Sequence, residues 1–132
     1  MANGTLYIIT DDEIIARFIV SKRWIRSDNS VKPEAFMPHP YPDLSVTRHL
    51  GLCESQLWII GKDVVAPTGR TLHGRADVEV FVVRNQDLKV TSAPLPQNQN
   101  HANVTGWPLG KPEQKIKALE IANKSTLFRN DT

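Results

Sequence analysis

The chain has little of several features that would classify it at once. Only one cysteine, Cys53, occurs among 132 residues, so no intramolecular disulfide can form and small disulfide-stabilised secreted scaffolds are excluded. Basic and acidic residues nearly balance at a formal net charge of +2, which provides no broad cationic surface for DNA binding. No apolar run approaches the roughly 18 residues of a membrane span, and residues 11–13 are acidic where a signal peptide would be apolar. We therefore expect a cytoplasmic protein without a membrane segment.

Motifs that mark a known chemistry are missing as well. The chain contains no glycine-rich phosphate loop, no Gly-x-Ser-x-Gly elbow, no His-Glu-x-x-His and no EF-hand loop. The single cysteine excludes cysteine-based zinc sites, and His39, His49, His73 and His101 lack the spacing of a histidine ligand pair. We expect neither a metal nor a cofactor.

What the chain does have predicts a mixed fold. Its 40% of apolar residues suffice for one core in a chain of 132 residues. Segments 54–65 and 112–124 have the apolar spacing of helices, and β-rich runs separated by turn residues occupy much of the rest. We predict a single α+β domain over residues 1–132, with a mostly antiparallel sheet of about four to six strands and two main helices packed on it.

Six short runs are expected to supply the strands. They are 5–9 and 13–20 as a first hairpin, 75–83 as a central strand paired with 88–91 in a second hairpin, and 44–47 and 102–106 as further strands. Arg17 lies within the apolar run 13–20, so it needs a partner if that strand is covered on both faces.

The remaining segments also carry expectations. Residues 22–26 should form one helical turn capped by Ser21. Four prolines make 33–43 an ordered, extended loop across the surface, and 125–132 should be a frayed tail. The last helix is expected to bury Ile116, Ala118, Leu119 and Ala122.

Histidines at the ends of segments are the best lead to function. Histidine titrates near neutrality, and loop positions beside strands are well placed to meet a ligand. Ser45, Thr47 and His49 alternate along one short run, as do His101, Asn103 and Thr105 along another, so each set shares one strand face. The segment 72–75 adds His73, a glycine and Arg75 at the start of the expected central strand.

If these strands lie side by side, their ends form a donor-rich cleft for a small anionic ligand, a nucleotide or an RNA end. His73 and His101 are then the catalytic candidates, exchanging a proton in phosphoester or glycosidic chemistry. The candidate ligand-binding residues are Arg17, Ser45, Arg48, His49, Arg75 and Asn103. Whether the chain is an enzyme stays open.

Each pattern also has a purely structural interpretation. His73 and the following glycine can simply begin a strand, Ser45 to His49 can be the polar face of an edge strand, and Trp107 can pack beside the last helix. The alternative function is a protein–protein interaction or regulatory module that uses Trp24, the proline-rich crossing and exposed apolar side chains. An enzyme should gather two histidines and an arginine in one pocket, whereas an interaction module should show an apolar patch and dispersed histidines.

Overall fold

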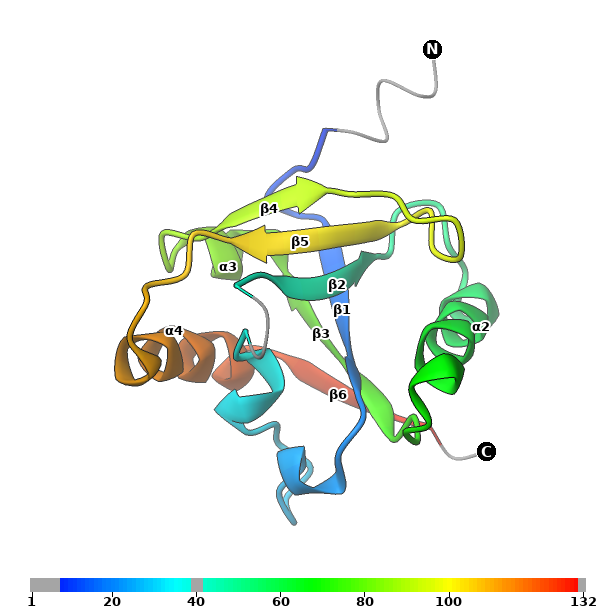
Figure 1. Ribbon diagram of the computed structural model, residues 1–132, viewed down its shortest axis with the longest axis horizontal. Helices are drawn as coiled ribbons and strands as arrows, with labels where there is room; N and C mark the ends of the chain where they lie inside the picture. The colour runs from blue at the N-terminus through cyan, green and yellow to red at the C-terminus, as the bar shows by residue number, and fades with distance from the viewer. Residues whose placement is uncertain (1–7, 39–41, 131–132) are drawn as a thin grey trace.

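The computed structural model describes residues 8–38 and 42–130, and within them every strand belongs to one antiparallel sheet of order β4-β5-β2-β1-β3-β6 (Figure 1). The strands are β1 (Ile14–Ile19), β2 (Leu44–Arg48), β3 (Gly74–Glu79), β4 (Lys89–Ser92), β5 (His101–Thr105) and β6 (Thr126–Arg129). The helices are α2 (Glu54–Val65), α3 (Val80–Arg84), α4 (Lys111–Asn123) and three 3-10 helices, η1 (Lys22–Trp24), η2 (Pro33–Phe36) and η3 (Ala66–Thr68). The predicted α+β fold, with two main helices on a mostly antiparallel sheet, is confirmed.

The two main helices cover opposite faces of the sheet (Figure 1). Side chains alternate between faces along each strand, so Ile15 joins the main core with α4 and η2. Its neighbours Ala16 and Phe18 face the other way, where they pack against Leu57 and Val65 of α2. One strand therefore supplies both hydrophobic cores.

The sheet is split between β1 and β2. These strands are paired only at Ile15 with Arg48 and at Ala16 with Thr47. Beyond that point β1 continues along β3 and β2 continues along β5, and the two strands diverge (Figure 1). The split matters because it opens the sheet beside the next residue of β1, which is Arg17.

The Arg17 side chain bridges this split. Its Nε donates to the carbonyl oxygen of Ala35 at 2.8 Å, and its Nη1 donates to that of Ser45 at 3.1 Å. The partner expected for an arginine in an apolar strand is thus a pair of backbone carbonyls from η2 and β2.

The expected central strand 75–83 is shorter than predicted, because β3 ends at Glu79 and α3 follows. Val80 and Val83 are both buried, so burial changes there from alternating to helical spacing. The backbone N–H groups of Val80 and Phe81 donate to the carbonyl groups of Glu13 and Asp11. The segment before β1 therefore accepts hydrogen bonds from the first N–H groups of α3, which have no partner within the helix.

Both predicted hairpins are wrong within the described residues. Ile8 and Ile9 form no strand, residues 5–7 lie outside the described range, and β1 pairs with β2 and β3. The other hairpin fails because α3 takes the chain away from β3, so β4 joins the far edge of the sheet beside β5.

The C-terminal segment is not frayed over its described part. β6 pairs with β3 from Thr126 to Arg129, and its Leu127 packs against the main core. Gly74 permits this close pairing, since a Cβ there would lie 2.6 Å from the carbonyl oxygen of Phe128. The prediction of a tail was wrong because β6 is held by a distant strand.

The last helix turns a different face to the core than predicted. Ala118 and Ala122 are buried as expected, and Ile121 joins them, but Ile116 and Leu119 are exposed. The small alanine side chains let α4 lie close to η2, where Phe36 is buried. Close packing of short side chains thus takes the place of the aliphatic stripe.

The predicted capped turn at 22–26 is present as η1, with the Ser21 hydroxyl accepting from the Arg23 backbone N–H. The extended crossing expected at 33–43 is wrong at its start, because Pro33 begins η2 and fits the first position of a helix. Residues 39–41 of that segment lie outside the described part. None of the helices in residues 8–38 and 42–130 has the length and hydropathy of a membrane span.

Candidate functional site

The predicted site residues are distributed over separate cavities. Arg17, Ser45 and His101 line one cavity of about 520 Å³, here called the central cavity. His73 lies in an adjoining depression of about 800 Å³, here called the outer hollow. His49 and Arg75 line a third cavity of about 430 Å³. The structure therefore does not bring His73 and His101 into one cavity, and His39 lies outside the described residues.

Arg75 is fully engaged by the protein. Its Nη1 and Nη2 donate to the two carboxylate oxygens of Glu54 at 2.8 and 3.0 Å, and its Nε donates to Asp77 at 3.1 Å. The guanidinium also lies between the rings of Trp58 and Phe128, 4.7 and 4.6 Å from their centroids. Burial lowers the pKa of Arg75, but its hydrogen bond to Glu54 and the charge of Asp77 outweigh burial and raise that pKa. Arg75 thus fastens α2 to the sheet.

His49 lies beside the same cluster. Its Nε2 is 3.3 Å from an oxygen of Asp77, but this buried nitrogen has no hydrogen bond of good geometry. Asp77 is already the acceptor for Arg75. The predicted ligand-binding residues His49 and Arg75 therefore lie together. There the positive charge of Arg75 is balanced by the carboxylates of Glu54 and Asp77.

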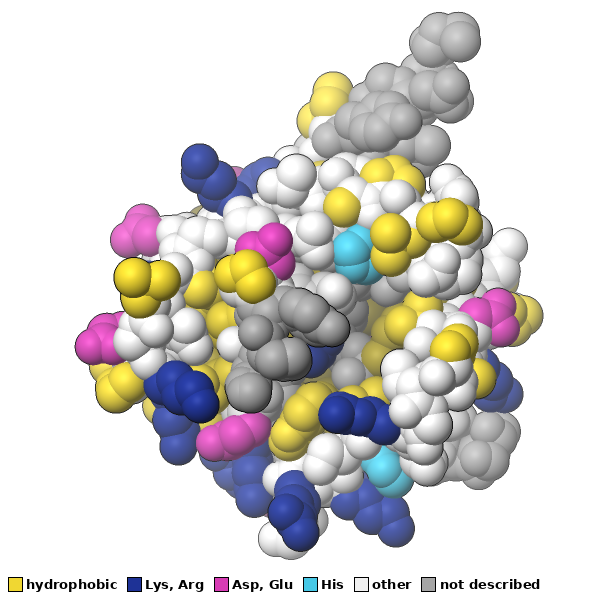
Figure 2. Space-filling view, viewed as in Figure 1, with side chains coloured by type: hydrophobic (Ala, Val, Ile, Leu, Met, Phe, Trp, Pro, Cys, Tyr) yellow, Lys and Arg dark blue, Asp and Glu magenta, His cyan; other side chains and the backbone are white. Residues whose placement is uncertain are grey.

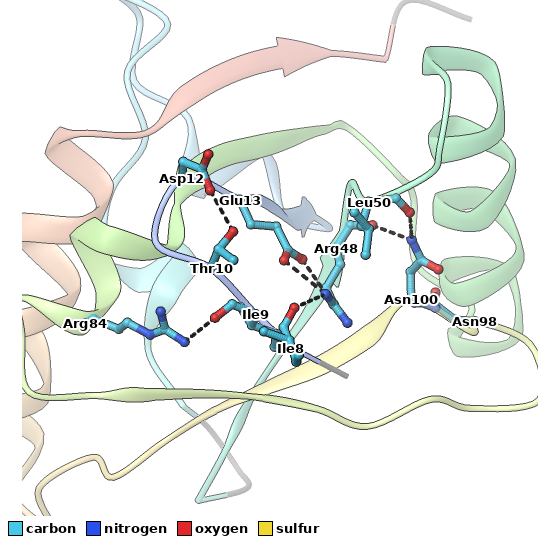
Figure 3. Close-up of polar contacts among 10 residues, drawn as sticks. All are labelled: Ile8, Ile9, Thr10, Asp12, Glu13, Arg48, Leu50, Arg84, Asn98 and Asn100. Carbon is cyan, nitrogen blue, oxygen red and sulfur yellow. Dashed lines mark hydrogen bonds and ion pairs between the residues drawn. The ribbon is translucent and has the colours of Figure 1, made fainter. Parts of the chain in front are cut away.

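Arg48 is buried in a polar network away from these cavities (Figure 3). It donates through Nε and Nη2 to the carboxylate of Glu13, and through Nη2 to the carbonyl oxygen of Ile8. The Asn100 amide donates to the carbonyl oxygens of Arg48 and Leu50. The arrangement fixes the segment before β1 against the end of β2.

The central cavity is lined by the Arg17 guanidinium, whose surroundings disfavour its positive charge. Burial, and then the positive charge of Arg70, lower the pKa of Arg17 to about 10. The guanidinium lies 5.7 Å from the centroid of the Trp24 ring, and among the described residues no carboxylate is bonded to it. A negatively charged ligand would relieve both causes of the shift.

His101 is oriented by its backbone partner. Its Nδ1 lies 2.8 Å from the carbonyl oxygen of Ala93, and because a carbonyl can only accept, Nδ1 carries the proton in the neutral ring. Nε2 is then the free acceptor of the imidazole. His101 pairs in register with Thr47, whose hydroxyl accepts from the buried Asn98 amide, so this wall of the cavity is pre-ordered.

Ser45 and Asn103 form the register pair two positions further along the same strands, on the same face of the sheet. Ser45 lines the central cavity, and Asn103, directly opposite, is partly buried on the same sheet face. Phe18, Val64 and Val65 provide the apolar side of the cavity. The cavity therefore combines cations, hydrogen-bonding groups and an apolar wall.

Two arginines of the site were missed from the sequence. Arg70 lines both the central cavity and the outer hollow, and Arg23 lines the outer hollow. Within the described part of the chain, they are the arginines whose guanidinium groups have neither a hydrogen bond nor an ion pair. Only the position of Arg70 directly after the helix-ending Gly69 could have drawn attention to it.

Figure 2 shows a hollow near the centre of one face, with Lys and Arg side chains gathered below it. Across residues 8–38 and 42–130, no group of three or more His, Cys, Asp or Glu side chains is arranged to hold a metal ion. Comparisons with protein families, with curated proteins and with solved structures found no match to this chain.

Proposed function

We propose that this domain binds a small anionic ligand, a nucleotide or an RNA end, in the central cavity. The observation that carries the proposal is the Arg17 guanidinium, which bridges the split between β1 and β2 without a carboxylate partner. Two of its five N–H groups donate to backbone carbonyls, which leaves the others for a phosphate or carboxylate. A cytoplasmic location, where such ligands are abundant, is part of the same proposal.

The other walls of the cavity support a nucleotide rather than a bare anion. Arg70 adds a second cation, whose guanidinium has no hydrogen bond or ion pair within the described part of the chain, and Ser45 and Asn98 supply hydrogen-bonding groups. The apolar wall of Phe18 and Val65 suits the flat face of a base or sugar. Binding sites for small organic ligands typically combine such an apolar lining with a few polar groups.

For catalysis, we propose His101 as the residue that transfers a proton. Its free Nε2 would act as a general base on a phosphoester or glycosidic substrate, while Arg17 and Arg70 held the negative charge. His73 is left out of this step because it lines the outer hollow instead. His101→Gln should then abolish turnover of a bound substrate while reducing its affinity much less.

The proposal predicts that Arg17→Met weakens binding of 5′-AMP and of inorganic phosphate by about tenfold or more, since charge-assisted hydrogen bonds are lost. Isothermal titration calorimetry measures the affinities, and thermal stabilisation by the same probes gives an independent readout. Lys111→Ala is the matched control, because Lys111 is an exposed cation at the start of α4 that lines neither cavity. Equal affinities for wild type and Arg17→Met, or no binding to either, would contradict the proposal.

The alternative function, a protein–protein interaction or regulatory module, is favoured by the apolar side chains exposed around α4. Leu109 is wholly exposed, and Ile116 on the helix is largely so. Trp24, in contrast, is partly buried against the main core. If anionic probes leave the protein unchanged while Ile116→Ser abolishes binding to a defined protein partner, the module is the better description.

A further inference from the structure

The outer hollow continues the central cavity along the surface. The two share Val20 and Arg70 as lining residues, so a ligand can pass from one to the other beside the Arg70 guanidinium. At about 800 Å³ the outer hollow is the larger of the two. A mononucleotide seated in the central cavity would therefore leave a larger adjoining space empty.

The outer hollow also has a surplus of positive charge. Arg23, Lys32 and Arg70 line it, and none of them forms an ion pair in the described part of the chain. Its one carboxylate, Glu34, is paired with Lys115 at 3.3 Å outside the hollow. By comparison, Arg48, Arg75 and Arg84 are each bonded to a carboxylate. The outer hollow therefore has three cationic side chains and no carboxylate paired with them in the described part of the chain.

An aromatic side chain lies among these cations. Trp24 lines the outer hollow, and its ring is packed beside the Arg17 guanidinium of the central cavity. Proteins that bind single-stranded nucleic acid combine a cationic groove along the phosphate backbone with aromatic rings that stack on bases. A duplex would need a broader cationic surface than this chain has.

Building on the proposed function, we propose that the ligand is the end of a single-stranded oligonucleotide. Its terminal nucleotide occupies the central cavity, Arg70 contacts the linking phosphate, and the following nucleotide lies in the outer hollow against Trp24, Arg23 and Lys32. The outer hollow then selects a strand over a mononucleotide.

The test compares 5′-AMP with a 5′-phosphorylated tetranucleotide of RNA and with its DNA counterpart, by calorimetry and fluorescence anisotropy. The RNA tetranucleotide should bind about tenfold or more tightly than 5′-AMP, because a second phosphate and a stacked base add to the interaction. The double variant Arg23→Ala/Lys32→Ala should lose most of that advantage and retain wild-type affinity for 5′-AMP. Both residues are on the surface of the hollow, so the variant should fold, as its thermal midpoint will show.

The outcomes separate this inference from the proposed function. If 5′-AMP binds through Arg17 but the tetranucleotides bind no more tightly, the inference is overturned and the proposed function stands. If the advantage persists in the double variant, the strand does not follow the outer hollow and the inference is again overturned. Stronger binding of RNA than of DNA would assign the ligand to RNA, and equal binding would assign it to single strands of either kind.

Discussion

At the residue scale, Arg75 and Arg17 of the sheet lie in electrostatic environments that shift their pKa values in opposite directions. Arg75 is bonded to two carboxylates that raise its pKa, whereas Arg17 is bonded only to carbonyls and its pKa is lowered to about 10. A cation that is desolvated without a counter-charge opposes folding. Under the proposed function, a bound anion would supply the missing counter-charge.

The contrast predicts that Arg75→Met lowers the free energy of unfolding by about 3–5 kcal/mol, because it leaves the nearly buried Asp77 carboxylate without its cation. Urea denaturation measures the change. Glu54→Gln is the control: the Glu54 side chain is 66% exposed, so losing its charge should change stability by less than about 1 kcal/mol. Similar losses in both variants would show that Arg75 acts through Glu54 and not through Asp77.

The predicted site can also be judged residue by residue. Arg17, Ser45 and His101 do meet in one cavity. Alternation along β2 and β5 predicts which side chains share the face of Ser45 and His101, but the split between β1 and β2 is what brings Arg17 to them. Arg70 and Arg23 could not be predicted, because their closeness depends on the pairing of β1 with β3, which brings the end of β1 beside the start of β3. Arg48 and Arg75 were predicted to bind a ligand, but their carboxylate partners Glu13 and Glu54 are distant in the sequence.

At the element scale, α2 depends on close contact with the sheet. Gly61 lies on the buried side of this helix, where a Cβ would be 2.8 Å from Cε1 of Phe18 and 3.2 Å from Leu72. Both neighbours are buried themselves, so neither side chain can move aside freely. The glycine therefore sets the distance between α2 and β1.

Gly61→Ala should destabilise the protein by about 1–3 kcal/mol through overpacking, although alanine favours a helix over glycine by about 1 kcal/mol. Chemical denaturation and the thermal midpoint measure the effect. Lys62→Ala, at an exposed position of the same helix, should leave stability nearly unchanged. A stabilised Gly61→Ala protein would mean that helix propensity outweighs the contact with Phe18.

The elements differ in how well the sequence predicts them. The predicted bounds of α2 agree with the structure, and α4 is shifted by one residue, because apolar periodicity and flanking prolines are local signals. β6 and the pairing of β4 were missed, because they depend on partners far along the chain. Val80 to Val83 resembled a strand locally, but these residues form α3, whose first N–H groups donate to the distant carbonyl groups of Glu13 and Asp11.

At the scale of the whole molecule, the small net charge of +2 does not reflect how unevenly the charged side chains are distributed. Arg48, Arg75 and Arg84 are neutralised by nearby carboxylates. Arg17, Arg23 and Arg70 line two adjoining cavities, and none of them forms an ion pair among residues 8–38 and 42–130. A local field of one sign attracts an oppositely charged ligand even when the total charge is small.

Salt should therefore weaken tetranucleotide binding in proportion to the phosphates contacted. On a plot of log affinity against log salt concentration, each phosphate contributes a slope of about −0.7 for a single strand. Arg70→Ala should make the slope less negative by about that amount, and Lys111→Ala should not alter it. Anisotropy titrations at several salt concentrations measure both, and a flat plot for the wild type would contradict phosphate recognition.

The split between β1 and β2 has a mechanical consequence. The halves β4–β5–β2 and β1–β3–β6 have longer ladders inside them, whereas the ladder between β1 and β2 has two residue pairs in the described part of the chain. Motion of one half of the sheet relative to the other should therefore be concentrated at this short ladder. A molecule bound in the split would contact both halves and restrict their relative motion. Ligand binding should therefore reduce the mobility of both halves along their whole length.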